Sequence, residues 1–279
     1  MIETEFGQLT RIVAWNINAR TNPVDLKQYI ESPLFAMRPD IFILTEYVAS
    51  EREHERFASV LANAGFVWTV TPPPTASVRK NRVLIASKFT LSEPIAPVAN
   101  SIRSASANYL HVRLSSLNFD LVGLRIPWYE SHHKEEKRRY PEWLISQLSP
   151  MVDRRVLVVG DFNFDPAARL QQKWIQEPIR EKLMASSDRS DVEARWLFYT
   201  PDDESPSFYT GSRLDHAMRT KRMPGPVSIR YASRVASNAI MTSRIPSDHA
   251  ALVMDFDFEA ELERRESSIQ SGAPKPMLV

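Results

Sequence analysis

The chain alternates between short apolar runs and polar segments, and its most regular run is Val156–Val159, four consecutive aliphatic residues. Such a run predicts a strand that is buried on both faces. Gly160 follows and allows a tight turn, after which Asp161 and Asn163 emerge on the same side of an extended chain. Gly-Asp-Phe-Asn is also an ordinary turn sequence, so this stretch alone leaves open whether it forms a turn or a functional site.

The other apolar runs predict further strands, and several of them end or begin at a polar side chain. Residues 12–15 end at Asn16, and residues 41–45 end at Glu46. Asp215 and the pair Asp248 and His249 stand at or before the start of later runs. The full set of predicted strands is 12–15, 41–45, 66–70, 83–88, 108–114 and 119–124 as an antiparallel hairpin, 156–159, 214–218, 227–232 and 250–258.

Helical spacing of apolar residues predicts outer helices between these strands. Residues 51–64 form the best amphipathic segment, with Gly65 at the position of a helix C-cap. Residues 131–148 combine a charged first part with a later apolar stripe, and residues 23–30 and 171–184 also favour helix. Because no internal repeat or linker divides the chain, we expect a single domain over residues 1–258 and an exposed or disordered tail over 259–279.

Composition excludes several kinds of chemistry. The 279 residues include 43% hydrophobic residues, enough for a large core, and 35 basic against 34 acidic residues give a formal net charge of +1. With no cysteine, the chain has no disulfide, thiolate metal site or cysteine nucleophile. Met1–Glu5 is acidic and no run reaches transmembrane length, so we expect an intracellular, cytoplasmic protein without membrane insertion.

The polar groups at the strand ends suggest a metal site. They are Asn16, Glu46, Asp161 with Asn163, Asp215, and Asp248 with His249. Hard oxygen donors with a single histidine suit Mg²⁺ or Mn²⁺ better than zinc. A histidine paired with an adjacent carboxylate has a raised pKa and acts as a charged donor, which favours phosphate chemistry.

In this order the same residues resemble the endonuclease/exonuclease/phosphatase superfamily. The matching motifs are Trp15-Asn16, Thr45-Glu46, Gly160-Asp161-Phe162-Asn163, Arg213-Leu214-Asp215-His216 and Ser247-Asp248-His249, with a weaker match at residues 84–88. The resemblance covers about residues 8–258. It implies an α/β fold, a four-layered α/β sandwich of two mainly antiparallel β-sheets flanked by helices, and metal-dependent hydrolysis of a phosphoester.

The resemblance also implies a role for each motif residue. Glu46 would be the principal ligand of Mg²⁺, with Mn²⁺ as a possible substitute, and Asn16 would complete or support the metal shell. Asp161 would orient or deprotonate the attacking water, and Asn163 would hold a phosphate oxygen.

The remaining roles concern the phosphoryl and leaving groups. His249, oriented by Asp248, would donate to the phosphoryl oxygen, and Asp215 would assist at the leaving group or at a second metal position.

One position departs from the family pattern. Many members have a histidine or tyrosine at the end of the strand over residues 120–126, where this chain has Arg125. Arginine can clamp a phosphate with two parallel hydrogen bonds, so we expect Arg125 to replace the histidine or tyrosine and to keep the phosphate contact. The alternative is that Tyr129, His132 or His133 takes this part.

The family does not fix the substrate, because it spans nucleases, deadenylases, inositol-phosphate phosphatases and sphingomyelinases. Residues 123–127 and 137–148 look most like the exonuclease III branch, although residues 206–209 lack the tryptophan common in DNA-repair members. We therefore expect a nuclease that binds nucleic acid, DNA rather than RNA, and infer no protein partner. The alternatives are hydrolysis of a small or lipid phosphate and a noncatalytic binding protein. Candidate substrate-binding residues are Asn18, Arg79, Arg82, Tyr129 and Arg138. Further basic groups that could track a nucleic-acid backbone are Lys80, Arg139, Arg219, Lys221 and Arg222.

Overall fold

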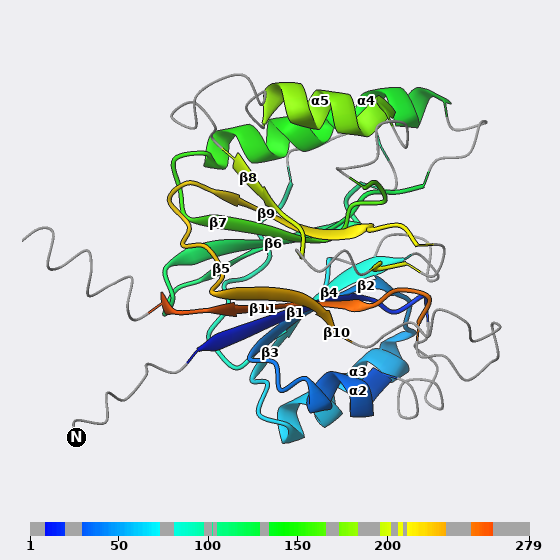
Figure 1. Cartoon of the computed structure of the whole chain (residues 1–279). Helices are drawn as coiled ribbons and strands as arrows, with labels where there is room; N and C mark the ends of the chain where they lie inside the picture. Colours follow the sequence, from blue (N-terminus) through cyan, green and yellow to red (C-terminus); the bar gives the residue numbers. More distant parts are fainter. Residues whose placement is uncertain are drawn as a thin grey trace, which may run out of the picture.

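Two β-sheets pack face to face, with helices on both outer faces, so the chain folds in four layers (Figure 1). The computed structural model describes residues 9–19, 30–72, 81–97, 102, 105–128, 134–165, 173–183, 196–201, 206–208, 211–232 and 247–258. The six-stranded sheet has the order β10-β11-β1-β2-β4-β3, and the five-stranded sheet has the order β5-β6-β7-β9-β8. This arrangement confirms the predicted α/β sandwich.

The elements follow the predicted order along the chain. The helices are α2 (Ser32–Ala36), α3 (Glu51–Asn63), α4 (Lys134–Leu148), the 3₁₀ helix η2 (Ser149–Met151) and α5 (Lys173–Lys182). The strands are β1 (Thr10–Asn16), β2 (Ile41–Tyr47), β3 (Trp68–Val70), β4 (Arg82–Ser87), β5 (Tyr109–Leu114), β6 (Phe119–Arg125), β7 (Val156–Asp161), β8 (Trp196–Tyr199), β9 (Asp215–Thr220), β10 (Ser228–Ala232) and β11 (Ala251–Phe256).

Strand directions bring the polar strand ends to one edge of the sandwich. Within these sheets only β1–β2 and β6–β7 pair in parallel, and the other neighbours are antiparallel. The ends of β1 and β2 therefore lie together, and β11 begins beside the end of β1. In the other sheet the register places Asp161, the last residue of β7, opposite Asp215, the first residue of β9.

The core explains why the central strands read as continuous apolar runs. In β7, Leu157 and Val159 lie in the cluster between the two sheets, whereas Val156 and Val158 lie in the cluster that includes residues of α4 and α5. Each sheet has helices on its outer face, so both faces of a central strand are buried. The predicted burial of Val156–Val159 on both faces is confirmed.

Helix α3 matches its prediction because its sequence carries both end signals. Ser50 is the N-cap, and its side chain accepts from the Glu53 backbone N–H while the Glu53 carboxylate accepts from the Ser50 backbone N–H, which forms a capping box. Gly65 follows the helix with φ of 89°, a conformation that favours glycine.

Three elements were not predicted, and two predictions fall outside the described residues. Helix α2 has five residues, strand β8 has four and the 3₁₀ helix η2 has three, too few for a periodic pattern to be visible. The helix expected over residues 23–30 lies outside the described residues except for Ile30, and the expected tail at 259–279 lies wholly outside them. Within the described ranges, no helix is both long and apolar enough to cross a membrane.

Candidate active site

The polar side chains at the strand ends form one group, which we call the site cluster: Asn16, Glu46, Arg125, Asp161, Asn163, Asp215 and His249. Asn16 ends β1, Asp161 ends β7 and Asp215 begins β9. His249 precedes β11, and Arg125 is the last residue of β6. The cluster therefore lies at one edge of the sandwich, and both sheets contribute residues to it.

The backbone is unusual at several of these positions. Glu46 has φ of 55° where the register of β2 against β4 shifts between Leu44 and Tyr47. Asn18 and Asn163 also have positive φ values, 47° and 52°. Non-glycine residues adopt this conformation at a cost, and such strain concentrates at functional sites. The bulge in β2 turns the Glu46 side chain toward the cluster.

Asn16 connects the two sheets. Its side-chain Nδ2 donates to Asp161 Oδ2 at 2.9 Å and to Glu46 Oε1 at 3.3 Å, and it lies 3.4 Å from His249 Nε2. Its Oδ1 accepts from the backbone N–H of Asn18 at 2.9 Å, which fixes the orientation of the amide. Asn16 is buried and thus holds the carboxylates of Glu46 and Asp161 near each other.

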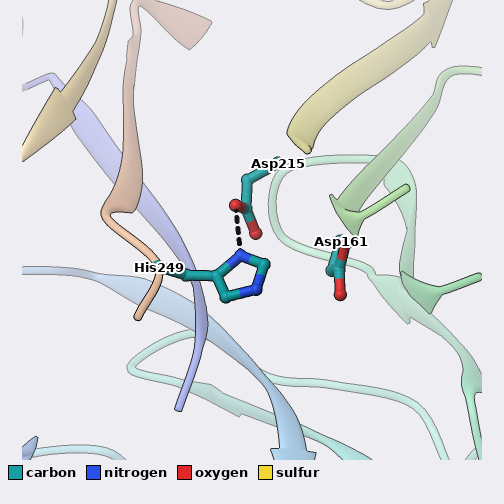
Figure 2. A group of neighbouring side chains, drawn as sticks. All are labelled: Asp161, Asp215 and His249. Atoms are coloured by element: carbon teal, nitrogen blue, oxygen red, sulfur yellow. Dashed lines mark hydrogen bonds and ion pairs between the residues drawn. The ribbon is translucent and has the colours of Figure 1, made fainter. Parts of the chain in front are cut away.

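His249 and Asp215 form a buried ion pair, and Asp161 lies beside them (Figure 2). His249 Nδ1 lies 2.8 Å from Asp215 Oδ2. Burial opposes the charged ring, but the attraction of Asp215 and its hydrogen bond, with help from Asp161, outweigh it and raise the pKa of His249 to about 9. At neutral pH the imidazole is protonated, and its Nε2–H remains available to an anion.

Asp161 is held by Asn163. The backbone N–H of Asn163 donates to Asp161 Oδ1 at 2.9 Å and its side-chain Nδ2 to Asp161 Oδ2 at 3.0 Å. Burial, together with the nearby Asp215, raises the pKa of Asp161 to about 6, although His249 and Arg125 favour the anion. A carboxylate with this pKa is ionised at neutral pH yet is basic enough to accept a proton from water.

The structure corrects the predicted partner of His249. We expected Asp248 to orient the ring, but the carboxylate on Nδ1 belongs to Asp215, and the half-buried Asp248 side chain lies 3.4 Å from Ser247 Oγ. The chain bends at Asp248, and the hydrogen bond that its carboxylate accepts from a described residue comes from Ser247 Oγ, so Asp248 does not orient the ring. The residue that contacts the His249 ring is therefore Asp215 of β9, and not the sequence neighbour Asp248.

Arg125 lies in the cluster, and its partner is Glu46. The guanidinium approaches Glu46 Oε1 through Nε at 2.9 Å and Nη2 at 2.7 Å, and Nε lies 3.8 Å from Asp161 Oδ2. Its predicted role as a phosphate clamp stays a prediction. Tyr129, His132 and His133, the alternatives to Arg125, lie outside the described residues.

The other predicted substrate-binding residues are spread over the molecule. Asn18 is exposed next to the cluster, and Arg82 donates to the Ala49 carbonyl oxygen at 2.7 Å. Arg138 pairs with Glu135 at 2.9 Å on an exposed face of α4. Arg79 and Tyr129 lie outside the described residues.

Some of the basic residues suggested to track nucleic acid lie far from the cluster. Arg219 is near the end of β9, and Lys221 and Arg222 follow that strand. Because β9 begins at the cluster with Asp215, these residues lie at the opposite edge of the sandwich. They do not form a basic surface next to the site.

Several supporting residues escaped the sequence interpretation. Ser207 Oγ accepts from the backbone N–H groups of Leu214 at 2.7 Å and Asp215 at 3.1 Å, and Tyr231 OH donates to the Asp215 carbonyl oxygen at 2.7 Å. Ser207 lies eight residues before Asp215, and Tyr231 lies in β10 of the other sheet. A buried hydroxyl leaves no periodic signal in a sequence.

Two residues inside the quoted motifs also hold the cluster. Trp15 Nε1 donates to the His249 carbonyl oxygen at 2.9 Å, and Ser247 Oγ donates to the Asn16 carbonyl oxygen at 2.5 Å. Ser247 Oγ also accepts from the His249 backbone N–H at 3.1 Å. The motifs therefore contain residues that support the site as well as residues of the site cluster.

A family model described as the Endonuclease/Exonuclease/phosphatase family matches residues 13–249. The chain belongs to this family. The match begins within β1 and ends at His249, so it spans every residue of the site cluster. The family resemblance noted in the motifs is thereby confirmed, and the chain has the fold and family membership of a hydrolase that acts on phosphoester bonds.

Individual relatives are distant. Nocturnin from Xenopus laevis is 19% identical over 295 residues, which cover 91% of this chain and 74% of that protein. An AP endonuclease from Archaeoglobus fulgidus superposes with a TM-score of 0.63 at 17% identity, covering 89% of this chain and 99% of the other. The 3′ phosphatase NExo from Neisseria, bound to a product DNA hairpin, gives 0.60 at 18% identity with coverage of 89% and 99%. At these identities the solved structures show the shared fold.

The cluster contains side chains of the types that could hold a divalent metal ion. Asp161, Asp215 and His249 offer ligand atoms that all lie within 4.8 Å of one another. The protonated His249, already bonded to Asp215, is a hydrogen-bond donor and not a ligand in this arrangement. Glu46 offers a second possible ligand for a metal ion. The hydrogen bonds that it accepts from described residues all reach Oε1, so Oε2 could bind the ion.

His216 belongs to a matched motif but lies behind the cluster, in the core. Its ring is within 5.0–6.4 Å of the rings of Phe162, Phe164 and Phe198. Nε2 lies 3.0 Å from the Phe164 carbonyl oxygen and 2.7 Å from that of Arg213. Burial lowers the pKa of His216 to about 4, so the ring is neutral and structural.

The neutral His216 predicts a pH-dependent stability. Below its ordinary pKa of 6.5 the unfolded chain binds a proton at this ring, which the folded protein accepts only near pH 4, so stability falls as the pH drops between these values. From pH 7 to pH 5 this loss is about 2 kcal/mol. Urea unfolding of the wild type and of His216→Gln at both pH values measures it. The variant should lack this part of the loss, and equal losses in both proteins would refute the assignment.

Proposed function

We propose that the protein is a divalent-metal-dependent phosphodiesterase that cleaves nucleic acid, with DNA as the favoured substrate. The observation that carries the proposal is the convergence of a basic carboxylate, Asp161, and a protonated imidazole, His249, on one buried site at the meeting edge of the sheets. In-line hydrolysis of a phosphoester needs a base for the attacking water and a positive donor for the charge that builds up on the phosphoryl group.

We assign each residue a role in the reaction from its contacts. Asp161, oriented by Asn16 and Asn163, accepts the proton of the attacking water. His249 donates through Nε2 to the phosphoryl oxygen while Asp215 holds its Nδ1 side. Because Asn16 Nδ2 and the protonated His249 Nε2 are both donors 3.4 Å apart, an anionic oxygen that accepts from both relieves their mutual repulsion.

Glu46 is the residue we assign as the principal holder of Mg²⁺ or Mn²⁺, with Asn16 in support. The ion would act as a Lewis acid on a phosphoryl oxygen. Glu46 is suited to this task because its carboxylate is half-buried, is fixed through Oε1 and has Oε2 without a hydrogen bond from the described residues. Carboxylate oxygen is the donor type that these hard ions prefer.

Two observations support nucleic acid as the substrate. Trp128 is 63% exposed and follows Ile126, whose carbonyl oxygen accepts from Asn163 Nδ2 at 2.7 Å, so a large aromatic surface lies next to the site. Exposed aromatic rings beside a phosphate site stack on nucleobases. The Neisseria relative of similar fold was solved with a DNA hairpin.

A small or lipid phosphoester is the second candidate substrate. Among the described residues, Arg125 is the arginine that lies in the cluster, whereas Arg138 pairs on α4 and Arg219 lies at the far edge. A cluster with one arginine among its described residues also suits a small anion.

The test is cleavage of end-labelled single-stranded, duplex, nicked and abasic DNA, and of a matched RNA, with Mg²⁺, Mn²⁺ or EDTA. We expect metal-dependent products that vanish in Glu46→Gln and persist in Glu142→Gln, a control at an exposed position of α4. A steep loss of binding with salt supports nucleic acid. Cleavage of a soluble phosphoester, with nucleic acid left intact, would contradict the nuclease proposal and support a small or lipid phosphoester as the substrate.

A further inference from the structure

Arg125 occupies an unusual place, because a permanent positive charge pairs with the carboxylate that we assign to the metal. Two of its nitrogen atoms, Nε and Nη2, lie 2.9 Å and 2.7 Å from Glu46 Oε1. The two side chains are only 14% and 17% exposed, so water screens the pair weakly. This inference rests on the proposed metal-dependent function.

The backbone of Arg125 is fixed while its side chain has a second anion within reach. Its N–H donates to the Asn108 carbonyl oxygen at 2.9 Å, and its carbonyl oxygen accepts from Tyr140 OH at 3.4 Å. The guanidinium Nε is 3.8 Å from Asp161 Oδ2 as well as 2.9 Å from Glu46 Oε1. The guanidinium therefore lies between two carboxylates of the cluster, on a backbone that two hydrogen bonds hold in place.

We propose that Arg125 couples metal binding to phosphate binding. Without a phosphate in the site, the guanidinium neutralises Glu46 and weakens the binding of a divalent ion. An arriving phosphate attracts the guanidinium, which forms bidentate hydrogen bonds with phosphate oxygens, and the full charge of Glu46 becomes available to the ion.

The direction of this effect follows from charge. A dication near Glu46 is repelled by the guanidinium on the same carboxylate, and the repulsion is large in a buried site. A bound phosphate relieves this repulsion, because the guanidinium then pairs with the phosphate and no longer with Glu46. The two ligands then increase each other's affinity by the same factor, which for coupled sites is typically about 5-fold to 150-fold.

A purely supporting role for Arg125 predicts the opposite result. Hydrogen bonds to a metal-binding carboxylate often orient it, and removing such a support weakens metal binding by about 10-fold to 100-fold. The sign of the change in metal affinity therefore separates the two roles.

The experiment is calorimetric titration of the full chain with Mn²⁺, with and without a fixed concentration of inorganic phosphate, and with free Mn²⁺ corrected for phosphate binding. The proteins are the wild type, Arg125→Gln, Arg125→Lys and Glu46→Gln. In the wild type, phosphate should tighten Mn²⁺ binding about tenfold or more. In Arg125→Gln, Mn²⁺ alone should bind about tenfold more tightly than to the wild type, and phosphate should add less than about threefold. Arg125→Lys keeps the charge and should retain weak binding of Mn²⁺ alone.

The outcomes separate this inference from the proposed function. If Glu46→Gln loses Mn²⁺ binding but Arg125→Gln binds Mn²⁺ as weakly as the wild type or more weakly, the coupling is refuted and the metal site stands. If Glu46→Gln binds Mn²⁺ normally, the metal assignment of Glu46 and the coupling are both refuted. Should Arg125→Gln fail to fold, the wild type still decides, because an Mn²⁺ affinity unchanged by phosphate contradicts the coupling.

Discussion

His249→Ala is expected to lower turnover by at least about a hundredfold, because it removes the protonated donor from the group where charge accumulates in the transition state. The ring is buried and its pKa of about 9 keeps it charged at neutral pH, so no water molecule replaces it at equal strength. Steady-state kinetics on the substrate found in the cleavage test measures the loss, with circular dichroism as the check of folding. Turnover within tenfold of the wild type would remove His249 from the mechanism.

Two neighbouring carboxylates provide a matched pair of variants for the same prediction. Asp215→Asn removes the charge that contacts Nδ1 at 2.8 Å, so it should lower turnover by about a hundredfold and lower the pKa of His249. Asp248→Asn removes a half-buried charge without a hydrogen bond to the ring, and it should leave turnover within about threefold. The reverse order would restore Asp248 as the partner of His249.

Gly160→Ala is expected to destabilise the fold by about 4 kcal/mol, from overpacking and backbone strain together. A Cβ at this position would lie far inside the 3.0 Å limit of real contacts, against the Leu124 carbonyl oxygen of the paired strand β6. The residue also has φ of +145°, which L side chains rarely adopt. Because Asp161 follows directly, the shift should also displace this carboxylate, which we propose as the catalytic base. Urea unfolding and turnover measure the two effects.

Gly65→Ala is the matched control for the backbone strain. Gly65 also has a positive φ, +89°, but a Cβ there meets nothing within 4 Å. Its replacement should cost about 1 kcal/mol and leave turnover unchanged, since the position is at the end of α3. Equal losses in the two variants would show that contact with Leu124 is not the cause.

The sequence by itself determined the fold class and marked, at the ends of apolar runs, the polar residues that the structure brings together. Val156–Val159 predicted a central strand because a strand covered on both faces must be apolar throughout. Ser50, Glu53 and Gly65 marked the ends of α3 through local hydrogen bonding and backbone preference. Strand β8 and helix α2 escaped because elements of four or five residues carry too little periodicity.

Only the tertiary structure decided which side chains meet. Asp215, not Asp248, reaches His249, because the packing of the two sheets places the start of β9 beside the segment that precedes β11. Arg125 pairs with Glu46, although 79 positions separate them along the chain. A periodic pattern reports which face of an element is buried, whereas the partner on that face depends on strand order, direction and register, which are properties of the assembled sheets.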